Sequence, residues 1–446
     1  MNEVIGRLKA AVAGRQSGRT GVLAIAAFTL ASKALGFLRE MLIAYFFGAT
    51  ALVDAFVVAN NIYGLTVGII GRAFSAAGTP LLVEKFVKEG QPAQRSAFFA
   101  FLRFALTSAL ALSLVLPLAA PGIVFLLAPR FSPETHWLSV KLLWAMLPMA
   151  VGMVGLSLAG AYLNARRRFG LDKLGDISVN LVAIGFLFSA PLIGIYSLAV
   201  GWSLGYFLAS CALLLPVVWR ARWWKGRLWT TEIKEFIALT APMLIAYAAN
   251  QVNVIVDRAF ASSLDPGSIA ALGYSWRLAL IPIMLAQAIS TVQLTRASEM
   301  AAARDIKRLK ASVRDILLKG AAVMIPASVA LVWLARPLVQ IVFQRGAFDA
   351  SATDKTSLAL VCYGFGLFPQ LAVLTLAASL RGMKDMKTPV MAGVIAVAAN
   401  IILNILLVRP FGIAGLATST SAAAALSAGV MGVRLLGSKM FNVGLK

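Results

Sequence analysis

Apolar runs of about 20 residues recur along the whole chain, and each is long enough for an α-helix to cross the hydrocarbon core of a bilayer. Only 13% of the 446 residues are charged and 60% are hydrophobic, whereas a soluble domain carries roughly a quarter charged residues. The recurrence excludes a single anchor joined to a globular domain. Transmembrane β-barrels are also excluded, because their strands are short and alternate apolar with polar residues. We therefore predict an all-α polytopic membrane protein.

About twelve transmembrane helices account for these runs, and the connections between them are too short to fold as a separate aqueous domain. Several spans contain Pro, which is tolerated where neighbouring helices cover the freed carbonyl groups. The predicted spans are 21–46, 54–82, 97–127, 137–163, 175–195, 197–219, 236–260, 268–294, 314–343, 355–380, 388–408 and 412–435.

The distribution of Lys and Arg predicts the orientation of the spans. Basic clusters recur in alternate loops, so we place those loops and both termini in the cytoplasm and the chain in the bacterial inner membrane. The formal net charge of +23 then lies beside anionic lipid headgroups, and not on one soluble face as in a nucleic-acid binder. The clusters are Arg166-Arg167-Arg168, the 220–227 group and the 304–310 group, whereas the outer loops hold Arg130, Arg345, Lys355 and Arg409.

A direct repeat relates the two halves of the chain. Residues 194–203 match residues 412–421 at five of ten positions, at an offset of 218, and Asn180 recurs as Asn400 at an offset of 220. An even number of helices in each repeat makes both halves enter the membrane in the same direction, so the substrate path is expected between two six-helix lobes. The predicted parts are a cytoplasmic basic tail 1–20, an N-terminal lobe 21–219, a cytoplasmic linker 220–235, a C-terminal lobe 236–435 and a cytoplasmic tail 436–446.

Basic residues also lie inside the predicted spans, where a Lys or Arg at mid-membrane costs at least about 2.5–3.5 kcal/mol. Lys33 and Arg39 share a broad face of the first span, and Arg277 lies in the eighth. The surplus suits a cavity that binds a diphosphate or another polyanion, because Arg makes bidentate contacts with phosphate oxygens. Helix–helix salt bridges are the structural alternative. The other charges in or near the spans are chiefly Arg72, Arg103, Lys141, Arg258, Arg336, Glu40, Asp54 and Asp257.

The motifs that would indicate an enzyme are absent from the sequence. It contains no G-x-x-x-x-G-K-[ST] loop for nucleotide, and its one histidine, His136, cannot form a metal cluster. Cys211 and Cys362 fall in apolar runs and are expected to be core residues. We therefore expect a transporter without catalytic residues, cofactor, metal or nucleotide. An intramembrane glycosyltransferase or ligase is the enzymatic alternative, although the outer-loop carboxylates form no evident pair.

Five ordered segments resemble the MurJ/MviN family of lipid-linked glycan flippases, within the MOP flippase superfamily. They are 33–40 (KALGFLRE), 47–49 (FGA), 53–56 (VDAF), 343–349 (FQRGAFD) and 384–390 (KDMKTPV). The resemblance covers essentially the whole chain. It implies two six-helix lobes around a central cationic cavity that opens alternately to each side of the membrane.

The resemblance also implies a substrate and site residues. The substrate would be a polyprenyl-diphosphate-linked saccharide such as lipid II, the peptidoglycan precursor. Arg39, Arg277 and Lys33 would hold the diphosphate, and Glu40 would orient Arg39 or compete with the substrate for it. Asp54 and Asp257 would line or latch the outer gate, and the further cavity or gate residues would be Arg72 and Arg258.

Three departures from the family keep other substrates open. The second helix has Val67-Gly68 where the family has a double Arg, with Arg72 displaced by more than a turn. Leu280 stands at the family's acidic position in the eighth helix, and the two additional C-terminal helices of lipid II flippases are not in this sequence. The alternative is a flippase for an exopolysaccharide or other envelope-glycan repeat unit. A multidrug exporter of the same superfamily is more remote, because it would place acidic residues in the cavity.

Overall fold

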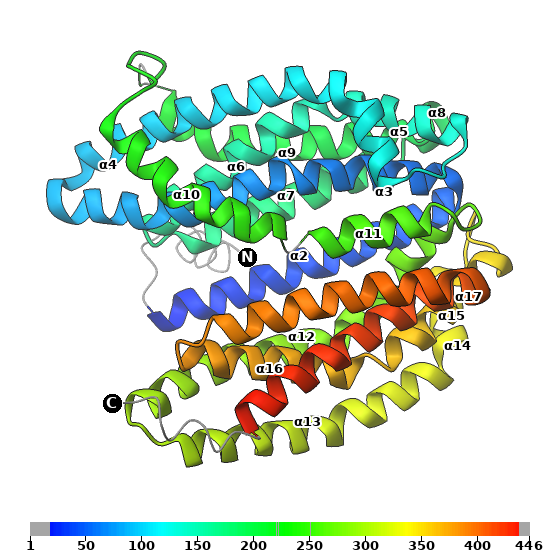
Figure 1. The fold of residues 1–446 in the computed structure, drawn as a ribbon. Helices are drawn as coiled ribbons and strands as arrows, with labels where there is room; N and C mark the ends of the chain where they lie inside the picture. The colour runs from blue at the N-terminus through cyan, green and yellow to red at the C-terminus, as the bar shows by residue number, and fades with distance from the viewer. Residues whose placement is uncertain (1–17, 220, 222, 250, 437–446) are drawn as a thin grey trace, which may run out of the picture. The chain divides into compact units, whose positions relative to one another are not determined.

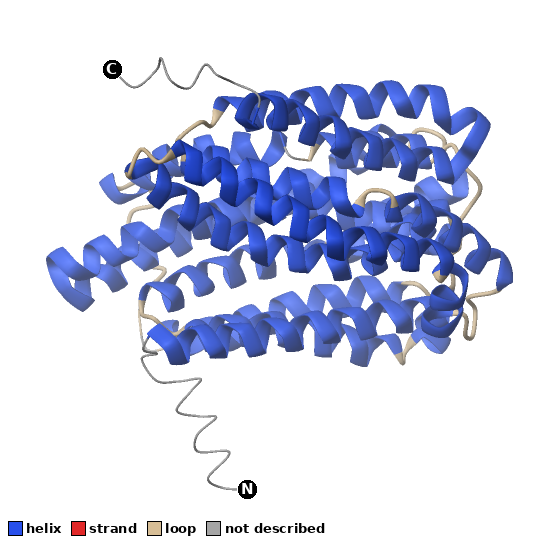
Figure 2. Cartoon of the chain, turned by 90° about the horizontal axis from the view of Figure 1, so that it is seen from below, coloured by secondary structure: helices blue, strands red, loops and turns tan. Residues whose placement is uncertain are grey.

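The computed structural model describes residues 18–219, 221, 223–249 and 251–436 of the chain. The predicted tails 1–20 and 436–446 therefore lie almost wholly outside the described residues, as do Arg220 and Arg222 of the basic linker. The described residues form helices joined by short loops and include no strand (Figure 2). The all-α prediction is confirmed.

Contacts divide the chain into two compact units: Met1–Phe47 with Ala51–Val252, and Gly48–Thr50 with Asn253–Lys446. In the first unit α6 packs on α4 and α9, and α7 packs on α2 and α9. The helices of this unit, coloured from blue to green in Figure 1, are α2 (Gly18–Phe47), α3 (Ala51–Leu65), α4 (Val67–Leu127), α5 (Pro133–Ala145), α6 (Leu147–Ala165), α7 (Phe169–Leu187), α8 (Ala190–Ile193), α9 (Tyr196–Val218) and α10 (Thr231–Ala249).

In the second unit α16 packs on α12, α13 and α17, and α15 packs on α12 and α17. Its hydrophobic core includes the fully buried Leu309, Val313 and Leu380. The helices of this unit are α11 (Val252–Ala261), α12 (Ser268–Ala302), α13 (Ile306–Trp333), α14 (Ala335–Phe343), α15 (Ala350–Gly364), α16 (Leu367–Gly382) and α17 (Lys387–Leu436).

Each predicted span coincides with one helix, a pair of broken helices or half of a kinked helix, except 54–82, which covers α3 and the part of α4 before its kink. Six helical stretches among the described residues qualify singly as membrane spans by length and hydropathy, and the bent pair α15–α16, with an angle of 46°, would be a seventh. Two of these stretches, Ala51–Leu127 and Lys387–Leu435, each contain two predicted spans. They are kinked at Gly90 (φ 84°) and Gly412 (φ 54°), where glycine tolerates a left-handed φ.

Large apolar side chains on the outside of the helices indicate what surrounds them. Leu118, Leu192 and Trp333 are each more than 80% exposed. Large apolar side chains exposed on many helices are unfavourable in water and favourable against lipid. Together with the apolar spans, this makes the chain a multi-pass membrane protein.

The two segments that most specifically resemble the MurJ/MviN family form helix boundaries. In 343–349, Gly346 adopts φ 61°, Phe348 is buried, and the Asp349 carboxylate accepts the Ala352 N–H (2.7 Å) at the start of α15. In 384–390, Asp385 accepts the N–H (3.0 Å) and the hydroxyl (2.6 Å) of Thr388 at the start of α17. Both motifs therefore satisfy helix N-termini by capping.

Candidate functional site

Arg39 lies at the meeting point of three helices of the first unit. From α2, its Nη1 donates to Asn180 Oδ1 on α7 and its Nη2 to Glu40 Oε1 (3.1 Å). Its Cζ lies 4.0 Å from the centre of the Trp202 ring on α9. The side chains of Arg39 and Glu40 are only 12% and 11% exposed. The guanidinium is therefore desolvated, and a nearly buried cation needs such partners.

The Asn180 amide is itself oriented by the helices around it. Its Nδ2 donates to Asp176 O (2.9 Å), one turn earlier in α7, and lies 3.4 Å from both the carbonyl oxygen and the hydroxyl of Ser32 on α2. These contacts turn the amide oxygen toward Arg39. The guanidinium group of Arg39 is thereby held in a fixed orientation, and its paired N–H donors are of the kind that recognises phosphate oxygens.

This geometry changes the expected role of Arg39 in packing. On the sequence, Arg39 is a cation that packing does not need. In the structure it neutralises the buried Glu40 and joins α2 to α7 and α9. Removing only one partner of a buried ion pair costs about 3–5 kcal/mol. Substitutions here must therefore address both charges together.

The other predicted residues of the first unit lie apart from this cluster. Lys33 is exposed on α2. Asp54 is 3% exposed, in the first turn of α3, where the positive end of the helix dipole favours a carboxylate. Arg72 is exposed on α4, with its Cζ 5.7 Å from the centre of the Tyr247 ring.

In the second unit, Asp257 on α11 is the centre of a carboxylate–amide cluster. Its Oδ1 accepts from Asn404 Nδ2 on α17 and its Oδ2 from Asn253 Nδ2 one turn earlier, each at 3.0 Å. Asn404 Nδ2 also donates to Asn400 Oδ1 (3.0 Å), and both of these asparagines are fully buried. Both oxygens of this carboxyl group are thus bonded by neutral amides, one from α11 itself and one from α17.

The remaining two predicted residues are also in the second unit. Arg258 Nη1 donates to Ile269 O at the start of α12 (3.4 Å). Arg277 is exposed on α12, two residues after the buried Ser275 and directly before the buried Leu278. The structure thus brings Arg39 and Glu40 together and gives Asp257 amide partners, whereas Arg277 presents its side chain at a helix surface.

Sequence reasoning missed the neutral members of both clusters. Asn180, Trp202, Asn253 and Asn404 were not predicted as site residues. The available signal was the recurrence of an Asn in an apolar span, as Asn180 and Asn400, which marked the repeat. An amide in such a span needs a partner. Asn180 bonds Arg39 of α2, and Asn400 bonds Asn404, which bonds Asp257 of α11. No group of three His, Cys, Asp or Glu that could hold a metal occurs among the described residues.

Comparisons with known proteins give a consistent result. The model of the family described as lipid II flippase MurJ matches residues 43–443. A probable lipid II flippase MurJ of Synechocystis is 29% identical over 425 residues, covering 90% of this chain and 78% of the relative. A lipid II flippase MurJ of Burkholderia cenocepacia is 28% identical, covering 91% of this chain and 81% of the relative.

Solved structures agree with these sequence relatives. A lipid II flippase MurJ in an inward closed conformation superposes with a TM-score of 0.79 at 26% identity, over 92% of this chain and 87% of that one. A multidrug resistance MATE family transporter of the MOP superfamily reaches a TM-score of 0.78 at only 10% identity, over 93% and 96%. The second likeness shows the shared fold alone.

Proposed function

The chain belongs to the lipid II flippase MurJ family, and we propose that it is a secondary flippase that carries lipid II, or a closely similar polyprenyl-diphosphate-linked saccharide, from the inner to the outer leaflet. The family match over nearly the whole chain is the observation that carries this proposal. Each MurJ relative and solved MurJ structure named above bears the same function in its name. The protein is then a transporter and not an enzyme.

The diphosphate is the part of such a substrate that intramembrane cations can bind. We propose that Arg39, Arg277 and Lys33 bind it, and that Glu40 holds Arg39 in place until the phosphate oxygens replace it. The near-burial of Arg39 and Glu40 supports this assignment, because contacts to phosphate are stronger in a desolvated site. Asp54, Asp257, Arg72 and Arg258 are assigned to the cavity or gate.

Transport would proceed by alternating access between the lobes 21–219 and 236–435, in the inner membrane with both termini in the cytoplasm. The basic loops support this orientation. Reporter fusions at residue 446 test it: a reporter active only in the periplasm would contradict the orientation and the even number of spans.

A second candidate substrate follows from the second helix. Val67 and Gly68 occupy the positions where the family resemblance leads us to expect two Arg. A Cβ atom built on Gly68 would lie 3.7 Å from Nη1 of the exposed Arg72. With fewer cations at these positions, an exopolysaccharide or other envelope-glycan repeat unit on the same lipid carrier is the alternative cargo.

Complementation tests the choice between these cargoes. Expressed in cells depleted of their own lipid II flippase, the protein is expected to restore growth. If it reaches the membrane intact and the cells still lyse, lipid II is not its cargo and the envelope-glycan alternative takes its place.

A further inference from the structure

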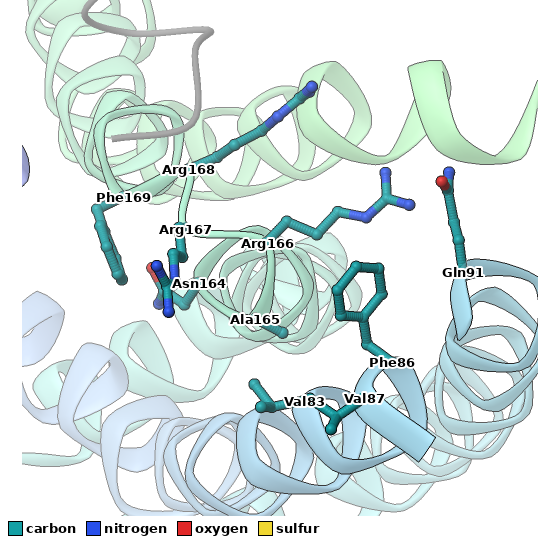
Figure 3. Close-up of a pocket in the computed structure, with 10 residues that line it drawn as sticks. All are labelled: Val83, Phe86, Val87, Gln91, Asn164, Ala165, Arg166, Arg167, Arg168 and Phe169. Carbon is teal, nitrogen blue, oxygen red and sulfur yellow. The ribbon is translucent and has the colours of Figure 1, made fainter. Parts of the chain in front are cut away.

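A cavity of about 870 Å³ lies within the first unit, between α4 and the loop that joins α6 to α7. One wall is apolar and is formed by Val83, Phe86 and Val87 of α4 with Phe169 of α7. The loop contributes three consecutive arginines, Arg166, Arg167 and Arg168 (Figure 3). The cavity lies outside the Arg39 cluster and contains none of the predicted site residues.

Arg166 is held in place before any ligand arrives. Its Nε donates to Gln94 Oε1 (3.2 Å), and its Cζ lies 4.8 Å from the centre of the Tyr162 ring. Gln94 is fully buried and donates in turn to Leu82 O (3.1 Å). Figure 3 shows Arg166 extending past Phe86 toward Gln91. The guanidinium is thus fixed at the cavity while Arg167 and Arg168 are exposed.

The positive charge of this loop is not neutralised by its neighbours. Within the part of the chain that the structure describes, no carboxylate forms an ion pair with any of the three arginines. The nearby carboxylates each pair with a lysine: Asp172 and Asp176 with Lys173 (3.4 and 3.2 Å), Glu84 with Lys88 (2.6 Å) and Glu89 with Lys85 (2.7 Å).

The equivalent loop of the second unit carries its own anion. Arg167 and Lys384 follow α6 and α16 with the same left-handed backbone, φ 60° and 63°. The backbone N–H of the following residue then bonds a carbonyl of the last helical turn: Arg168 donates to Leu163 O, and Asp385 donates to Leu380 O (both 2.9 Å). In the second unit that next residue is Asp385, which caps the following helix. In the first unit it is Arg168, and α7 begins without a side-chain cap.

We propose that this cavity captures the diphosphate of the lipid-linked substrate on the basic side of the membrane, before transport. The proposal rests on the proposed function. Three arginines match a group that carries two or more negative charges better than they match a single phospholipid phosphate, and each can bind phosphate oxygens in a bidentate manner. The apolar wall is suited to the first isoprene units of the lipid chain. Arg166, Arg167 and Arg168 then determine the affinity for substrate, and Arg39 its translocation.

Equilibrium binding of farnesyl diphosphate to the full chain in phosphatidylcholine nanodiscs tests the proposal. The measurement is made with K33Q, R39Q, E40Q and R277Q in place, so that the proposed transport site does not contribute. Adding R166Q and R168Q is expected to weaken binding about 100-fold, since two charged contacts are lost and each contributes about a factor of ten. V87E places a negative charge on the apolar wall at a 75% exposed position and is expected to weaken binding without affecting folding.

R304Q is the matched control. Arg304 follows α12 in the second unit with the same left-handed backbone (φ 57°) and is not among the residues that line the cavity. This variant is expected to bind farnesyl diphosphate like the parent. Inorganic pyrophosphate is expected to bind more weakly than farnesyl diphosphate, because it cannot use the apolar wall.

Transport kinetics give the second readout. In an otherwise unaltered chain, R166Q/R168Q is expected to raise KM for the lipid substrate while kcat is retained. Unchanged farnesyl diphosphate binding in both R166Q/R168Q and V87E would overturn the proposal. Complete displacement of the probe by phosphatidylglycerol in the nanodisc would also overturn it, in favour of a phospholipid site. A wild-type protein that binds the probe but does not move lipid II would overturn the proposed function and leave the capture site standing.

Discussion

The two units place opposite charges at the same position of the repeat. Arg39-Glu40 on α2 and Asp257-Arg258 on α11 are 218 residues apart, which is the offset that relates the two halves of the sequence. Each first-named residue bonds an asparagine of a later helix in its own unit: Arg39 bonds Asn180, and Asp257 bonds Asn404, one turn from Asn400. In both halves a charged residue is therefore bonded to an asparagine of a later helix, but that residue is a cation in the first half and an anion in the second.

The two clusters differ in how the charge is stabilised. Arg39 has an adjacent carboxylate and an aromatic ring, so the first unit holds a nearly neutral pair that a phosphate can enter by displacing Glu40. Asp257 has the adjacent Arg258, but its carboxylate oxygens are bonded by neutral amide donors. We therefore expect a phosphate to compete with Glu40 for Arg39, whereas the amide-bonded carboxylate of Asp257 offers no such exchange. The comparison predicts that the first cluster binds the substrate and that the second acts on the gate.

The largest effect is expected from neutralising the first cluster. R39Q/E40Q removes both charges together and so leaves no buried ion unpaired. We expect transport to fall at least about 100-fold, because two charged phosphate contacts of about 1.5–3 kcal/mol each are lost, while expression and membrane insertion stay normal. Lipid II flipping in reconstituted vesicles measures the loss. Near-normal flipping would mean that the cluster only packs helices, and would remove the distinction between the units.

Asp257 gives the next largest effect. D257L leaves the amide donors of Asn253 and Asn404 without their acceptor, at about 1–3 kcal/mol for each unsatisfied group. D257N keeps one acceptor oxygen and is expected to lose less. Thermal unfolding of the purified proteins should therefore rank them wild type, D257N and D257L in order of decreasing stability. Equal stability of the two variants would show that the amides do not depend on this carboxylate.

Asn180 and Asn400 are repeat-related and give a matched pair of variants. N180A removes the amide that orients Arg39, so we expect about a tenfold loss in kcat/KM for lipid II, equal to one hydrogen bond of a charged group. N180Q, which can still offer an amide oxygen, should restore part of it. N400A removes a partner of Asn404 and is expected to change unfolding temperature more than transport. The reverse pattern would contradict the roles assigned to the two units.

Many of the fold-level predictions followed from sequence, because span length and hydrophobicity are local properties. Whether a span is broken depends on tertiary contacts. The predicted span 236–260 is two helices, α10 and α11, since α10 packs on α4 in the first unit while Asp257 of α11 bonds α17 in the second.

The candidate sites were harder to predict, for a related reason. Arg39 and Asp257 stood out as charges in apolar runs. The partners that join them to other helices are neutral and distant in sequence, with Asn180 141 residues from Arg39 and Asn404 147 residues from Asp257. Nothing in the local pattern of Trp202 distinguishes a ring that covers a guanidinium from one that faces lipid.

The smallest effect concerns the two repeat-related loops. Burial alone would raise the pKa of Asp385, but hydrogen bonds from the Thr388 hydroxyl and from the backbone N–H groups of Thr388 and Lys387 hold that pKa below its ordinary value. D385A should cost about 0.5–2 kcal/mol at neutral pH through the lost cap. Because the folded pKa is lowered, this stabilisation is complete above the ordinary Asp pKa of about 3.9 and is lost as pH falls through the folded value.

Unfolding temperatures of wild type and D385A between neutral pH and about pH 3 measure this effect. The difference between the two proteins should shrink on acidification. A difference that is constant with pH would show that the Asp385 carboxylate does not hold the start of α17. R168A, at the corresponding position of the first unit, should leave stability unchanged.

The central claim is that the chain moves lipid II and that the paired charges of the first unit bind its diphosphate. The most direct measurement is the transfer of fluorescent lipid II between the leaflets of vesicles that contain either the wild-type protein or R39Q/E40Q at matched protein content. The account predicts rapid transfer by the wild type and transfer near the protein-free rate by the variant. Equal transfer by both proteins, or transfer of an envelope-glycan repeat lipid but not of lipid II by the wild type, would contradict it.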